Sequence, residues 1–148
     1  KRTWQQSLIQ IERGLARWCA GDTDAAIGIA EGILAEDDLH AGAYLLLALA
    51  AGTAEDERRR DPEAAATCLA IADDLGRSHE NDFVRAMLLA TAGKRADAAA
   101  LLRQAATRDP YGFGAFHYTA EAERLAPAPP DKPKEKPKEK PKSKPKPN

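Results

Sequence analysis

Apolar residues recur at every third or fourth position along most of the chain, which is the spacing of one face of an α-helix. The first of these runs contains Trp4, Leu8, Ile11, Leu15 and Trp18. Thr3 precedes the run and Gln6 follows three residues later, the spacing of a capping box, while Gly21 suits a C-terminal cap. The pattern therefore predicts a first helix that begins after Thr3 and ends before Gly21.

Six more helices follow from the same pattern and from the glycines and prolines that interrupt it. We expect the second to begin at a cap on Asp22 or Thr23, and the fifth at a cap on Asn81 or Asp82. The others are expected at residues 41–52, 61–76 and 93–110, and from 113 to a stop at Pro127. β-Branched and aromatic residues are sparse, which favours helix over strand. The predicted fold class is all-α, with about seven antiparallel helices in three hairpins and a closing helix.

The chain also repeats itself. The stretch from Gly93 to Pro110 has a near copy earlier in the chain, which begins at Gly21. Within the two stretches Ala98 corresponds to Ala26, and Asp109 corresponds to Asp37. Self-similarity at a fixed spacing is the sequence signature of a helical repeat.

These stretches resemble the second helix of a tetratricopeptide repeat, with its G-D-x-x-x-A start and its D-P end. Residues 41–51, A-G-A-Y-L-L-L-A-L-A-A, resemble the first helix of such a repeat. The resemblance covers residues 7–126 and implies a right-handed superhelix. Two family periods are about four residues shorter than the offset from Gly21 to Gly93, and we expect these extra residues in the connection Thr53–Asp61. Arg13 and Arg85 fall where the family has a large apolar residue, and a one-residue shift of those helices would restore an apolar core.

In this family the first helices of successive repeats line a concave groove that binds a peptide. The resemblance places in that groove Ile11, Leu15, Trp18, Leu45, Leu49, Phe83, Met87, His117 and Glu121. Such a lining suits an amphipathic helix or a hydrophobic segment of a protein partner. Helical spacing does not distinguish groove residues from core residues, so both interpretations stay open here.

Residues suited to catalysis or metal binding do not gather in the sequence. The three histidines fall in different repeats, and only His117 shares a helix face with an acid, Glu121, whereas a metal site needs at least three ligands. No glycine-rich phosphate loop, C-x-x-C pair or nucleophile-elbow motif is present. Cys19 and Cys68 are expected to be buried core thiols. We therefore expect a protein without enzymatic activity, cofactor, metal or small-molecule substrate.

The end of the chain differs in composition from the rest. We expect residues 1–126 to form the helical domain and residues 127–148 to form a disordered low-complexity tail, kept extended by alternating proline and lysine. From Asp131 onward eight lysines stand against three acids, a net charge of +5, which leaves −6 for residues 1–130. An inert solubilising tail is one interpretation. The other is binding to an anionic partner through Lys132, Lys134, Lys136, Lys138, Lys140, Lys142, Lys144 and Lys146.

The function that these patterns favour is a protein–protein interaction scaffold or adaptor, which holds a partner segment in a larger assembly. The Ala/Arg/Asp-rich composition is typical of bacterial proteins, in either the cytoplasm or the periplasm. A small chaperone for secretion or assembly substrates is an alternative, and anionic-polymer binding through the tail is a weaker one. Self-association of the acidic body with the basic tail is also open. The chain has no apolar run long enough for a transmembrane helix. Because it does not begin with Met, we expect that its start is a processed end or a cut, and that an upstream signal or anchor could have been removed.

Overall fold

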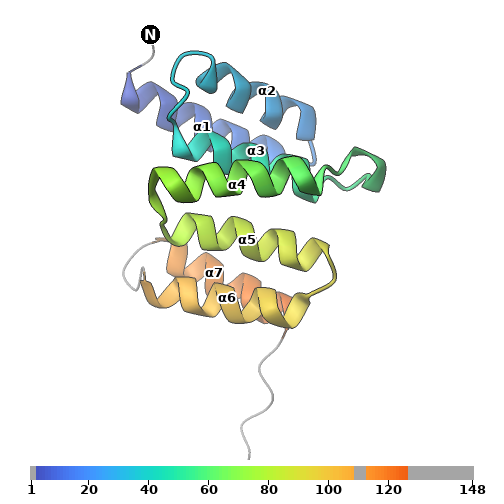
Figure 1. Ribbon diagram of the computed structural model, residues 1–148. Helices are drawn as coiled ribbons and strands as arrows, with labels where there is room; N and C mark the ends of the chain where they lie inside the picture. The colour runs from blue at the N-terminus through green and yellow to red at the C-terminus, as the bar shows by residue number, and fades with distance from the viewer. Residues whose placement is uncertain (1–2, 109–112, 127–148) are drawn as a thin grey trace, which may run out of the picture.

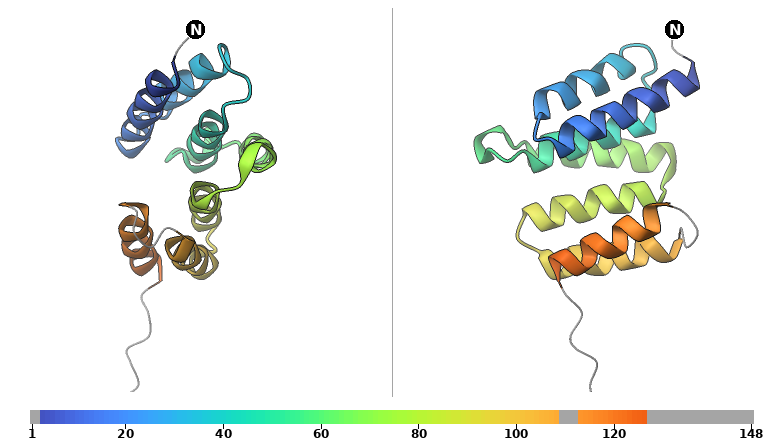
Figure 2. Two further views of the ribbon diagram at one scale, coloured as in Figure 1. Left: turned by 90° about the vertical axis from the view of Figure 1, so that its left-hand side faces the viewer. Right: turned by 180° about the vertical axis from the view of Figure 1, so that it is seen from behind.

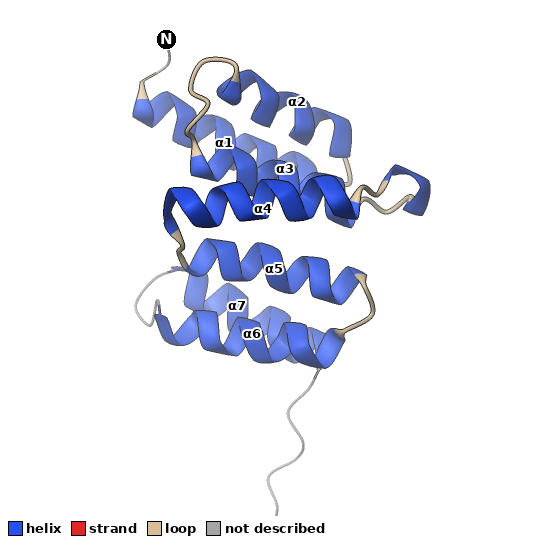
Figure 3. Ribbon diagram, viewed as in Figure 1, coloured by secondary structure: helices blue, strands red, loops and turns tan. Residues whose placement is uncertain are grey.

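The computed structural model describes residues 3–108 and 113–126. Within these ranges the chain forms seven α-helices and no strand (Figures 1 and 3). Their bounds are α1 Trp4–Cys19, α2 Thr23–Leu34, α3 Ala41–Thr53, α4 Pro62–Gly76, α5 His79–Thr91, α6 Arg95–Arg108 and α7 Phe113–Leu125, with a short 3₁₀ turn, η1, at Glu57–Arg59. The prediction of an all-helical fold with seven helices is confirmed for this part of the chain.

The helices follow one another as three antiparallel hairpins, α1/α2, α3/α4 and α5/α6, and α7 packs against α6. Helix α3 lies at the centre, where it contacts α2, α4 and α5. Seen along the helices, the stack curves so that α1 and α7 lie on the same side of it, with α3 and α5 between them (Figure 2, left). We call this side the concave face.

The repeat that the sequence predicts is visible in how two helices end. Helices α1 and α5 each stop before a glycine in the left-handed region, with φ of +78° at Gly21 and +82° at Gly93. In both, the glycine N–H bonds back to the carbonyl three residues earlier, and the next N–H bonds to the carbonyl five residues earlier, at 2.9–3.0 Å. This is the Schellman motif, which a non-glycine residue would adopt only with strain. Two identical caps therefore stand at matching points of the first and third hairpins.

The second helices repeat the same buried positions. Three side chains of α2, those of Ala26, Ala30 and Ile33, are fully or almost fully buried. The residues that correspond to them in α6, Ala98, Leu102 and Ala105, are fully buried too. Burial at matching positions shows that the two hairpins pack in the same register.

The extra residues of the middle repeat lie where the sequence placed them. The α3–α4 connection takes eight residues, 54–61, whereas the α1–α2 and α5–α6 connections take three each. It folds back on α3, since Asp61 N–H donates to Ala51 O at 2.9 Å and Arg60 Nε donates to Ala54 O at 2.7 Å. Arg59 forms an ion pair with Asp24 of α2, so this arginine-rich loop is tied to its own neighbours.

Burial distinguishes Arg13 and Arg85 of the first helices from the residues that follow them. Gly14 and Ala86 are buried, and each stands one residue after an arginine, Arg13 and Arg85. A Cβ on Gly14 would lie 2.3 Å from Leu46 Cδ2, so α1 and α3 touch at this glycine. Arg13 is exposed and Arg85 is half-buried, so neither arginine occupies a fully buried core position.

Two sequence expectations are wrong. Helix α5 begins at His79, because Ser78 forms a capping box with Asn81, and neither Asn81 nor Asp82 is the cap. Both of those residues lie inside the helix and are buried. Cys19 is exposed at the end of α1 and Cys68 is half-buried, so they are not two core thiols; the pKa of Cys68 is raised, chiefly by this burial and also by Asp61.

The tail and its lysines, residues 127–148, lie outside the described residues, and the expected boundary at 126/127 is not tested. Among the helices that are described, none is long and apolar enough to span a membrane.

Candidate functional site

An aromatic row crosses the concave face from α1 to α7. The Trp18 ring meets Phe83 of α5 edge-on, with centroids 6.5 Å apart, and Phe83 stacks on Tyr118 of α7 at 5.5 Å. The Tyr118 hydroxyl lies 2.8 Å from His79 Nδ1 at the start of α5. The row joins three of the first helices, so it fixes the shape of the concave face.

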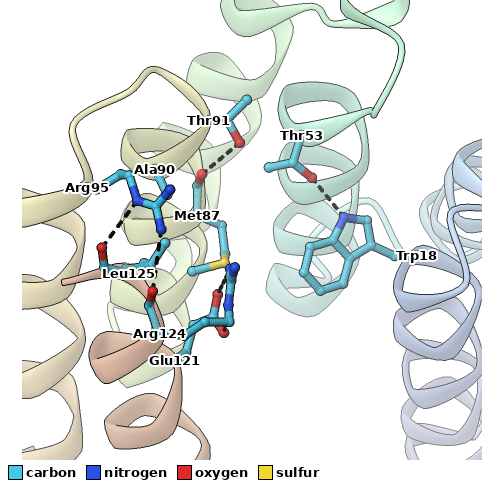
Figure 4. Close-up of a pocket in the computed structure, with 9 residues that line it drawn as sticks. All are labelled: Trp18, Thr53, Met87, Ala90, Thr91, Arg95, Glu121, Arg124 and Leu125. Carbon is cyan, nitrogen blue, oxygen red and sulfur yellow. Dashed lines mark hydrogen bonds and ion pairs between the residues drawn. The ribbon is translucent and has the colours of Figure 1, made fainter. Parts of the chain in front are cut away.

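Beside this row the concave face contains a hollow of about 340 Å³. Its walls come from α1, α3, α5, α6 and α7 (Figure 4). The residues that line it are Trp18, Thr53, Met87, Ala90, Thr91, Arg95, Glu121, Arg124 and Leu125.

The lining repeats the same positions of successive first helices. When the long α3–α4 loop is allowed for, Trp18 of α1, Ala90 of α5 and Arg124 of α7 are equivalent to one another. Thr53, Thr91 and Leu125 are equivalent at the next position, and Met87 and Glu121 at a third. Equivalent positions of successive helices therefore line the hollow. At the first of these positions α5 has the small Ala90, whereas α1 and α7 have the large Trp18 and Arg124.

The two threonines of the hollow have the same local structure. Thr53 Oγ1 donates to Leu49 O at 2.7 Å, and Thr91 Oγ1 donates to Met87 O at 2.9 Å. Thr53 Oγ1 also accepts a hydrogen bond of 2.8 Å from Trp18 Nε1. That bond holds the indole against α3 and sets the α1 wall of the hollow.

Charged groups line the α7 side of the hollow. Arg95 Nε donates to Leu125 O at 3.2 Å, which satisfies a carbonyl at the C-terminus of α7. Arg124 donates to both carboxylate oxygens of Glu121, one bond being 2.9 Å long. This bidentate pair lowers the pKa of Glu121 below its usual value, although partial burial opposes the effect, and it raises the pKa of Arg124.

The structure divides the predicted groove residues into three groups. Trp18, Met87 and Glu121 line the hollow. Leu45 and Leu49 are buried in the core, and Ile11, Leu15 and Phe83 are half-buried against it. His117 is exposed on α7. For Leu45 and Leu49, the core interpretation is the one that fits their burial, so they are not part of the exposed concave face.

Sequence reasoning missed Thr53, Thr91, Arg95 and Arg124. A signal for the first two existed, because Thr53 and Thr91 stand at the same position of two successive repeats. The four extra residues expected in the Thr53–Asp61 connection make these two positions equivalent, but the period does not show that they line a hollow. Arg95 carried no such signal, since it reaches the hollow from the start of α6.

No protein-family model matches this chain, and no curated protein or solved structure is significantly similar to it. Within the described residues, no three His, Cys, Asp or Glu side chains come close enough together to hold a metal ion.

Proposed function

We propose that this chain is a non-enzymatic interaction scaffold, folded as a right-handed superhelix of the tetratricopeptide type, which holds a segment of a partner protein in a larger bacterial assembly. The observation that carries the proposal is the hollow on the concave face, built from equivalent positions of parallel first helices. A surface made in this way extends along the stack, as the binding surfaces of helical repeats do.

The chemistry of the hollow indicates what it would bind. Apolar contact would come chiefly from the half-buried Trp18, because Met87 and Leu125 also line the hollow but are only 8% and 7% exposed. The Glu121–Arg124 pair adds charged groups at the edge of the hollow. A volume of about 340 Å³ lies near the lower end of the range for small-ligand pockets, so it suits a few anchoring side chains of a partner segment. The partner segment should carry an apolar anchor flanked by polar residues, as an amphipathic helix does.

The proposal is tested by filling the hollow without disturbing the stack. Thr91→Trp places an indole in the hollow, and Thr67→Trp is its matched control on α4. Both threonines donate to the carbonyl four residues earlier, Thr67 Oγ1 to Glu63 O at 3.0 Å, but Thr67 is exposed and away from the concave face. The immobilised variants would be used to capture partners from a lysate of the source cell, with bound proteins quantified by mass spectrometry.

We expect at least one specifically retained protein to be lost with Thr91→Trp, by tenfold or more, and kept with Thr67→Trp. Circular dichroism and thermal unfolding of both variants establish that the fold is retained. A set of captured proteins that is the same for both variants would contradict a binding role for the hollow.

A further inference from the structure

The acidic residues of the chain are concentrated in its first half. Residues 18–57 contain nine acids and no lysine or arginine. Three of these acids, Asp22, Asp24 and Glu57, pair with arginines outside that range. Four of the nine lie at the end of α2 and in the turn that follows it, where Glu36 already has an interaction partner and Asp37 accepts from Leu39 N: Glu31, Glu36, Asp37 and Asp38.

Large apolar side chains are exposed at the same end of the molecule. Trp4 is 72% exposed, Leu39 69%, Ile9 59% and Leu8 41%. Because α1 and α2 are antiparallel, the first turns of α1 lie beside the last turns of α2 (Figure 1). The following turn is held there too, since Tyr44 Oη donates to Asp38 O at 3.1 Å. We call the four apolar and four acidic residues together the α1–α2 corner.

We infer that the α1–α2 corner binds the Lys/Pro-rich end of the same chain, residues 139–148. This segment contains Lys140, Lys142, Lys144 and Lys146, and prolines at 141, 145 and 147. A sequence of this kind favours polyproline II, which is recognised by aromatic surfaces because it loses little entropy on binding. Trp4 supplies such a surface, and the four acids complement the four lysines.

The length of the chain allows the contact within one molecule. Helix spacings of about 9 Å put α7 roughly 27 Å from α1 along the stack, and Trp4 lies a further ~20 Å along the helix direction from the end of α7. The diagonal of about 34 Å needs roughly 11 extended residues at ~3.1 Å each. Residues 127–138 cover that distance, which leaves 139–148 to bind.

Binding to the same chain has an advantage over binding to a second copy. A tether of this length holds the segment at an effective concentration in the millimolar range, above the protein concentration of ordinary solutions. The contact must be weak and salt-sensitive, because its charges are exposed and because Lys1 and Arg2 lie close to Trp4 in the sequence and offset two of the acids.

Nuclear magnetic resonance of the full chain tests this directly, because the protein has two tryptophans and hence two indole N–H signals. Trp4→Phe assigns them. In the distal variant, Lys140, Lys142, Lys144 and Lys146 are changed to Glu; in the matched control, Lys132, Lys134, Lys136 and Lys138 are changed instead. Both variants alter the net charge equally, and both keep the full length of the chain.

We expect the distal variant to shift the Trp4 signal by more than its linewidth, while the control leaves it near the wild-type position. About 0.5 M salt should move the wild-type signal to the position seen in the distal variant, since screening then acts within about 4 Å. An unchanged Trp4 signal would overturn the inference, and equal shifts in both variants would overturn the assignment to residues 139–148. A shift of the Trp18 signal instead would place the tail at the hollow, and a sedimentation coefficient that rises with concentration would identify a second copy as the binding partner; either result overturns the contact proposed here.

Discussion

At the scale of single residues, the most unusual side chain is the fully buried carboxylate of Asp82 in the first turn of α5. Arg77 lies 2.9 Å from it and Arg85 3.4 Å, and Arg108 at the end of α6 also pairs with it. Next to it the buried Asn81 donates to Asp73 Oδ1 of α4 at 2.9 Å. A buried charge is tolerated only when it is paired and hydrogen-bonded, so this network locks α4, α5 and α6 together.

We predict that Asp82→Ala lowers the free energy of unfolding by about 3 kcal/mol, because it leaves several arginines without their common partner and opens a buried polar site. The matched control is Asp24→Ala. Asp24 also pairs with an arginine, Arg59, but its side chain is largely exposed, and removing such a pair costs about 0–1 kcal/mol. Urea denaturation of both variants measures the difference. Equal losses of stability would mean that burial does not decide the strength of these pairs.

At the scale of helices, local sequence determined most of the ends. The Thr3–Gln6 capping box, the Asp61–Pro62 start of α4 and the glycine stops at Gly21 and Gly93 are all in the structure. The start of α5 was mispredicted because Ser78, and not Asn81 or Asp82, is the cap. Asn81 is instead the third residue of the capping box, with its Oδ1 accepting from Ser78 N, and Asp82 pairs with Arg108 of α6.

The packing of neighbouring helices depends on Gly52. A Cβ at this position would lie 2.1 Å from Leu88 Cδ2 of α5 and 2.9 Å from Ala65 Cβ of α4. The Leu88 methyl group can turn aside, but the Ala65 Cβ cannot, so a side chain at position 52 would push α3 and α4 apart. In α1 the equivalent repeat position is taken by Trp18, and the contact between α1 and α3 is less extensive than the contact between α3 and α5.

We therefore predict that Gly52→Ala destabilises the protein by about 1–3 kcal/mol through overpacking. Gly28→Ala is the control, since Gly28 lies in α2 with nothing within 4 Å of the added Cβ. Alanine is the better helix former, so this change should stabilise by about 0.5–1 kcal/mol. Thermal unfolding should show opposite shifts. A stabilising Gly52→Ala would mean that α3 and α4 are not packed as closely as described.

At the scale of the whole molecule, the two ends of the stack have unequal cores. The larger cluster of buried residues spans α3 to α7 and includes Leu49, Leu69 and Leu102. The smaller one joins α2 and α3, with partly buried residues of α1 packed against it, and four of its six buried members are alanines. Less apolar area is buried at the α1/α2 end, so this end should open more readily.

The sequence predicted only part of the candidate site, because it does not show which helices cover each residue. Trp18, Met87 and Glu121 reach the hollow, whereas Leu49, at the position equivalent to Met87, and Leu45, one turn before it, are buried in the core. Periodicity identifies the inward side of each helix. It does not show which helix then covers that side, because coverage depends on the spacing of helices that Gly52 and the long α3–α4 loop set.

The unequal cores lead to a prediction about how the molecule opens. Leu46 and Leu102 are both almost completely buried, but Leu46 packs at the α1/α2 end, against Gly14, and Leu102 lies in the larger cluster. Removing either side chain to alanine should cost about 2–5 kcal/mol. The two substitutions should destabilise different helices, because each hairpin of a repeat stack contacts mainly its neighbours. We expect Leu46→Ala to speed amide hydrogen exchange in α1 and α2 while α5 and α6 stay protected, and Leu102→Ala to speed exchange in α5, α6 and α7. Uniform loss of protection in both variants would mean that the stack opens as one cooperative unit. The α1/α2 end would then be no less stable than the rest of the stack.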